Sequence, residues 1–112
     1  MYKELEKKAE ELGKLITQTE EFKEVKAKQA KLFENQEALN LFQEFNRLQR
    51  ENDIKKEEGS LTDEDSKKTE QLELKMLDYP IIKEFLEAQT KLQKILNLVM
   101  QTVIKTSTKG SR

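Results

Sequence analysis

The chain has 112 residues and a formal net charge of −1, with 38% charged residues against 35% hydrophobic ones. It contains no cysteine and no histidine, which excludes disulfides, thiolate metal sites and thiol catalysis and removes the commonest general base. The near-zero net charge gives no global electrostatic reason to expect a nucleic acid or an anionic membrane as partner. The N-terminal stretch "MYKELEKKAEE" is charged and has no apolar core, so we expect a cytoplasmic protein without a secretory signal.

Helix is favoured along nearly the whole chain, because good helix formers dominate and glycine and proline are rare. Apolar residues at three- and four-residue steps predict a first helix over about 2–16. A second helix is expected over about 19–33, with Thr17 or Thr19 as its N-cap. A third is expected over about 36–57, although the second and third could instead form one continuous helix.

Polar residues with capping chemistry separate the third predicted helix from its neighbours. Asn35 can cap its N-terminus. The clearest break in the chain is "EEGSLTDED", where Gly59 can take the left-handed conformation that ends a helix. Thr62 followed three residues later by Asp65 resembles a capping box, with Asp in place of the usual Glu or Gln. These signals predict a fourth helix over about 63–77.

The last helix start is marked by "LDYPII", in which Asp78 can cap and Pro80 sits in the first turn. The fifth predicted helix runs to about residue 105, and we expect residues 106–112 to form a frayed tail. The sequence therefore predicts a single all-α domain over residues 1–105. Its expected architecture is an elongated bundle of four to five helices with a long C-terminal helix.

Apolar residues lie on most sides of the fifth predicted helix, where they form two stripes. Leu98 lies outside both stripes. The most apolar segment of this helix, "ILNLVMQTVI", is too short to span a membrane, because a spanning helix needs about 20 apolar residues. Such a helix is buried on several sides, either by the other helices of its own chain or by another chain at an interface. We weigh these two alternatives equally. The candidate interface or core residues are Ile82, Phe85, Leu92, Ile95, Leu96, Val99, Met100, Val103 and Ile104.

Residue patterns with catalytic or metal-binding chemistry are missing from the chain. The acids from Asp63 to Asp65 suit the positive end of a helix, and neighbours in sequence point to different sides of it. A calcium loop starting at Asp63 would need glycine at its sixth position and glutamate at its twelfth, where the chain has Lys68 and Leu74. We predict no catalytic residue, no metal and no cofactor. Direct nucleic-acid binding is a minor alternative, suggested by the lack of acids from residue 88 onward, without a recognised reader motif.

Four segments carry a resemblance to a known family. They are "LGKLITQTEEFKEVK", "KLFENQEALNLFQEFNRLQ", the charged hinge "KKEEGSLTDED", and "DYPIIKEFLEAQTKLQKILNLVMQTVI" with its proline-started helix and "EAQ" triplet. Together they cover nearly all of residues 1–105. The chain resembles the YlbF/YmcA family of small bacterial helical proteins, which includes YheA-like members.

The resemblance implies an all-helical homo-oligomer, or a hetero-oligomer with related helical proteins, and no enzyme. It implies a regulatory role of the kind that links some members to competence, sporulation, biofilm development and a complex that directs ribonuclease Y in messenger RNA processing. Other members have no assigned role, so the alternative is a protein that acts only as a structural helical oligomer. Some members carry a cysteine-bearing extension associated with an iron–sulfur cluster. Because this chain has no cysteine, cluster binding is not expected of it.

Overall fold

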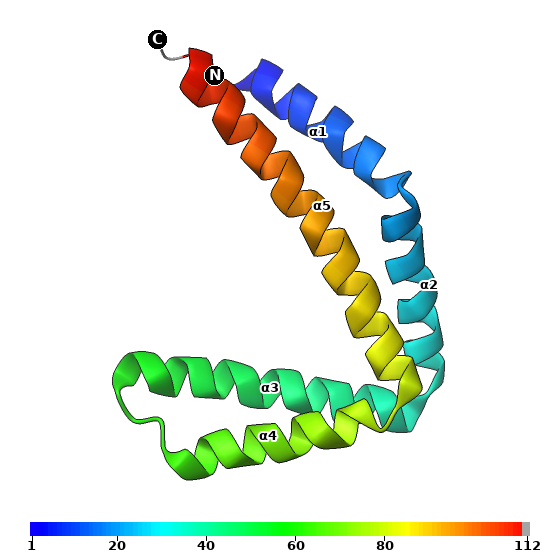
Figure 1. Cartoon of the computed structure of the whole chain (residues 1–112), viewed down its shortest axis with the longest axis vertical. Helices are drawn as coiled ribbons and strands as arrows, with labels where there is room; N and C mark the ends of the chain where they lie inside the picture. Colours follow the sequence, from blue (N-terminus) through cyan, green and yellow to red (C-terminus); the bar gives the residue numbers. More distant parts are fainter. Residues whose placement is uncertain (111–112) are drawn as a thin grey trace. The chain divides into compact units, whose positions relative to one another are not determined.

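The computed structural model describes residues 1–110, which form five helices and no strand (Figure 1). This confirms the predicted all-α class and the long C-terminal helix. In chain order the helices are α1 Lys3–Thr17, α2 Glu20–Glu34, α3 Gln36–Glu58, α4 Asp63–Leu77 and α5 Pro80–Gly110.

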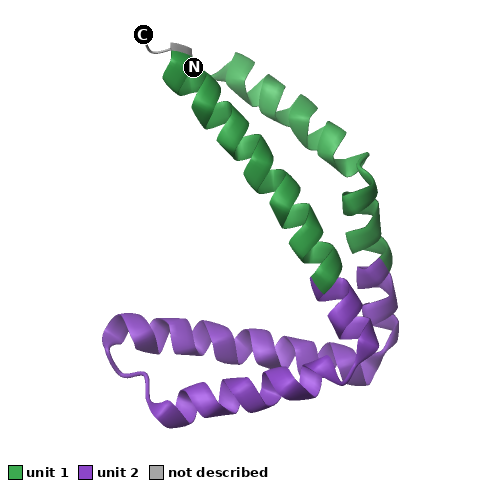
Figure 2. Ribbon diagram, in the orientation of Figure 1, with its two compact units in different colours: residues 1–27, 87–112 green, residues 28–86 purple. Residues whose placement is uncertain are grey.

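The chain divides into two compact units, which Figure 2 shows in different colours. Unit 1 consists of residues 1–27 and 87–112, and so holds α1, the start of α2 and most of α5. Unit 2 consists of residues 28–86, and holds the end of α2, the α3–α4 hairpin and the first turns of α5.

Side-chain caps set the starts of α2 and α3. The Thr19 hydroxyl accepts a hydrogen bond from the Phe22 backbone N–H at 3.2 Å. The Asn35 side-chain oxygen accepts a hydrogen bond from the Ala38 N–H at 3.0 Å, and the Asn35 backbone is extended. An extended cap residue cannot continue the helix before it, so α2 and α3 are separate helices. Of the two threonines considered for α2, Thr19 is therefore the cap.

The break between α3 and α4 follows the predicted chemistry. Gly59 has φ 75°, in the left-handed region, and ends α3. At the start of α4 the Thr62 hydroxyl accepts from the Asp65 N–H at 3.2 Å, while an Asp65 carboxylate oxygen accepts from the Thr62 N–H at 3.1 Å. The reciprocal pair confirms the capping box.

Two details at the ends of α5 differ from the sequence-based predictions. Asp78 does not cap α5 but ends α4, and Pro80 is the first residue of α5, which makes Tyr79 the cap position. Proline is favoured at the first helical position, so the cap is the residue directly before it. The helix also continues past residue 105 to Gly110, because no glycine or proline intervenes before that residue. The last two residues of the predicted tail, 111–112, lie outside the described residues.

Full burial among the described residues is concentrated in unit 2. The rings of Phe42 and Phe85 meet edge to face, with centroids 5.5 Å apart and planes at 82°. In α1, all of whose residues are described, no side chain is fully buried. The buried apolar residues are Leu32, Ala38, Phe45, Met76, Ile82 and Phe85 in unit 2 and Ala88 in unit 1.

Candidate interaction surface on the C-terminal helix

The apolar side chains of α5 are buried near its first turns and exposed near its last. Ile82 is 0% exposed and Phe85 is 5% exposed, whereas Met100 is 57% and Ile104 58% exposed. Between these ends lie half-buried side chains, namely Leu92, Ile95, Leu96 and Val99. One helix therefore supplies core residues at its N-terminal end and uncovered apolar residues at its C-terminal end.

The structure separates the nine predicted interface or core residues into groups. Ile82 and Phe85 belong to the core of unit 2. The other seven belong to unit 1, where Leu92, Ile95, Leu96 and Val99 are half-buried. We define the apolar flank as the three remaining residues, which are exposed: Met100, Val103 and Ile104.

Part of the apolar flank is turned away from the half-buried face of α5. At about 100° of rotation per residue, Met100 and Ile104 are turned by about 80–140° from the half-buried Leu92 and Val99, whereas Val103 is turned from them by only about 20–40°. The first helix, α1, is 15 residues long and runs in the opposite direction to α5 within unit 1 (Figure 1). It also leaves apolar side chains of its own uncovered, with Leu5 67% exposed.

A second arrangement lies at the far end of the α3–α4 hairpin. The Asn52 amide donates to the Thr69 hydroxyl at 2.5 Å, and the Lys55 ammonium is 3.0 Å from an Asp65 carboxylate oxygen. The bond from Lys55, followed by those from Thr62, lowers the pKa of Asp65 below its ordinary value. These polar pairs continue a seam that is apolar closer to α5, where Phe45 lies in the core.

Sequence reasoning missed these cross-hairpin pairs, although a signal was present. Asn52 and Lys55 continue the alternating three- and four-residue spacing of Phe45 and Leu48 in α3. Such spacing places them on the face that meets a partner helix. A polar residue at one of these positions fixes the register of two paired helices, so we interpret the cluster as structural.

A shallow recess opens beside the other end of the hairpin, with a volume of about 540 Å³. On its wall the Tyr79 hydroxyl donates to a Glu37 carboxylate oxygen at 2.6 Å, and this bond raises the pKa of Tyr79 above its ordinary value. The remaining lining residues are Asn40, Leu41, Glu44, Lys75 and Asp78. Among the described residues no group of three or more acids is placed to hold a metal ion.

The part of the chain that the structure describes contains no helix both long enough and apolar enough to cross a membrane. The apolar flank of α5 brings three exposed apolar side chains together within about one turn of helix. Uncovered apolar side chains that cluster on one side of a helix are typical of a surface that binds another protein.

Comparisons with known proteins agree with the helical architecture. Residues 5–106 match the family model described as "Control of competence regulator ComK, YlbF/YmcA". A similar solved structure is the X-ray crystal structure of Bacillus subtilis RicA in complex with RicF, with a TM-score of 0.71 at 19% identity over 100% of both chains. No curated protein sequence gives a significant match.

Proposed function

Because this chain belongs to the YlbF/YmcA family, we propose that it is a non-enzymatic adaptor that binds another helical protein of the family through α5. The partner is a second copy of the chain or a related sequence. The bound state would act in the cytoplasm in the control of competence, sporulation or biofilm development, or in messenger RNA processing by ribonuclease Y.

The observation that carries this proposal is the exposure of the apolar flank. Met100, Val103 and Ile104 are 57%, 49% and 58% exposed, and they follow one another within a single turn and a half of helix. All three lie inside the region that matches the family model. Burying these side chains against a partner helix would remove apolar surface from water, which is the main favourable contribution to association.

The family assignment supports a regulatory rather than a catalytic role, because the family model describes control of a regulator. The similar solved structure supports association with a second protein, since RicA was solved in complex with RicF. In this chain the same kind of association would cover the apolar flank of α5 with a second protein.

The proposal is tested by placing charges on the apolar flank. We expect Met100→Asp together with Ile104→Asp to reduce the assembly to the mass of one chain, because two unpaired carboxylates would be buried at the interface. Since both side chains are exposed within the chain, the helical circular dichroism signal should be unchanged. Light scattering at micromolar concentration measures the mass.

The matched control is Leu98→Asp, a similar substitution on the same helix at a residue that is 63% exposed and outside the apolar flank. It should leave the mass unchanged. If both variants keep the wild-type mass, alone and when mixed with a related family member from the source cell, association does not use the flank and the proposal fails. Val99 is less suitable for this test, because it is half-buried within unit 1.

A further inference from the structure

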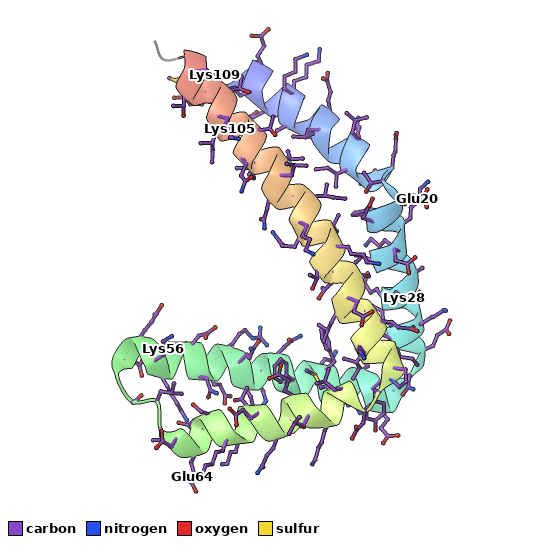
Figure 3. All side chains as sticks on the ribbon, in the orientation of Figure 1. Glu20, Lys28, Lys56, Glu64, Lys105 and Lys109 are labelled. Carbon is purple, nitrogen blue, oxygen red and sulfur yellow. The ribbon has the colours of Figure 1, made fainter. Side chains whose placement is uncertain are left out.

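A line of lysines occupies the side of α5 away from the apolar flank. We define the lysine stripe as Lys91, Lys94, Lys105 and Lys109, with Leu98 between them; all five are exposed. At 100° per residue the four lysines fall within an arc of about 60°, and from first to last they span about 27 Å of the helix axis. Lys105 and Lys109 lie on the last turns of α5 (Figure 3).

Acids are scarce along the part of α5 that carries the lysine stripe. Residues 88–110 contain no aspartate or glutamate. Within the described residues, none of the four lysines forms an ion pair, whereas Lys28 pairs with Glu84 at 3.3 Å. Glu87 lies one turn before Lys91 on the same side of α5, so the excess of positive charge is greatest at Lys94, Lys105 and Lys109, on a chain whose net charge is −1.

The helix dipole accounts for only part of this row. Cations are favoured in the last turn of a helix, and Lys109 is in the last turn of α5. The effect falls off within that turn, so it gives no reason for Lys91 and Lys94, which lie more than four turns earlier. These two lysines extend the stripe well beyond what helix stability requires.

Leu98 and the lack of nearby aromatic side chains favour a protein over a nucleic acid as the partner of the stripe. Leu98 is 63% exposed and sits near the middle of the lysines, off the apolar faces of α5. A protein partner can cover this apolar side chain with one of its own and remove both from water, whereas a phosphate backbone offers nothing apolar to it. Single-stranded nucleic acids are instead held on aromatic platforms, and the last aromatic residue of this chain, Phe85, is buried in unit 2.

We propose that the lysine stripe docks an acidic amphipathic helix of a partner protein. Carboxylates at three- and four-residue steps on that helix would face the lysines, and an apolar side chain between them would cover Leu98. This docking is separate from the proposed association through the apolar flank, because the two surfaces lie on roughly opposite sides of α5. The same adaptor could then hold two partners at once.

The test uses the full chain and a labelled synthetic helical peptide with glutamates at this spacing around one central leucine. Fluorescence anisotropy at low salt should show binding. Lys94→Gln together with Lys105→Gln should weaken it by about tenfold, since exposed charge pairs contribute modestly each. Leu98→Ala should also weaken it by about threefold. A control pair on α4, Lys67→Gln with Lys68→Gln, removes the same charge and should change binding less than twofold.

Three results would overturn the inference. One is no detectable binding of the acidic peptide at low salt. Another is an equal loss of peptide affinity in the stripe variant and the control variant, because the affinity would then depend on net charge alone. The third is tighter binding to oligouridine or to phosphatidylserine vesicles with no effect of Leu98→Ala, which would identify a phosphate-bearing ligand. The stripe variant should keep the wild-type mass in light scattering, so its outcome is independent of the test of the apolar flank.

Discussion

Replacing Phe85 by alanine should destabilise the protein more than any change on its surface. The side chain is 5% exposed and packs edge to face against Phe42. Truncating a buried phenylalanine costs about 3–5 kcal/mol, and loss of the aromatic pair accounts for about 1 kcal/mol of this. Small domains have a total stability of about 5–15 kcal/mol, so the variant should lose a large share of it.

Urea unfolding followed by far-ultraviolet circular dichroism measures this effect. With a slope of about 1–3 kcal/mol/M, the unfolding midpoint should fall by about 2 M. Protein concentration must be equal in all samples, because association adds to apparent stability. Leu74→Ala is the control: its side chain is 66% exposed, and the expected change is within about 0.5 kcal/mol. Equal midpoints for the two variants would refute the assignment of Phe85 to the core.

Three further predictions concern backbone conformation and pH. Gly59→Ala should cost about 1 kcal/mol because φ is 75° there, whereas Gly13→Ala, inside a helix with nothing within 4 Å, should stabilise by about 0.5–1 kcal/mol; thermal unfolding compares the two signs. The lowered pKa of Asp65 contributes stability that is present above its ordinary pKa of 3.8 and is lost as pH falls through the folded-state value; Asp65→Asn should remove part of this acid dependence in urea midpoints measured against pH. The raised pKa of Tyr79 should fall towards 10.0 in Glu37→Gln, and ultraviolet absorbance measures this in a background that lacks the chain's other tyrosine. In the unchanged chain, the stability linked to this raised pKa should be lost as pH rises past 10.

The ends of several helices could be predicted from the sequence because they depend on local capping residues. The capping box of Thr62 and Asp65 and the left-handed Gly59 depend on neighbours within a few residues, and the structure confirms both. Asp78 was assigned to the wrong helix because Asp and Pro80 both favour a helix start, and only the backbone shows which residue comes directly before the first turn.

Contacts between segments that are far apart in the sequence could not be predicted from such local signals. Periodicity places Leu92 and Met100 on different faces of α5, but it does not say which face other helices of the chain cover. Likewise, the bond between Asn52 and Thr69 requires knowing that α3 and α4 pair, and in which register. The use of the apolar flank as an interface stays a prediction for the same reason.

Sedimentation equilibrium on the unmodified chain tests the central claim most directly, because association through α5 must raise the mass in solution. A single chain has a mass of 13.2 kDa. At micromolar concentration we predict at least twice that mass, for the chain alone or mixed with a related family member, declining on dilution. A mass of 13.2 kDa under all of these conditions would contradict the account.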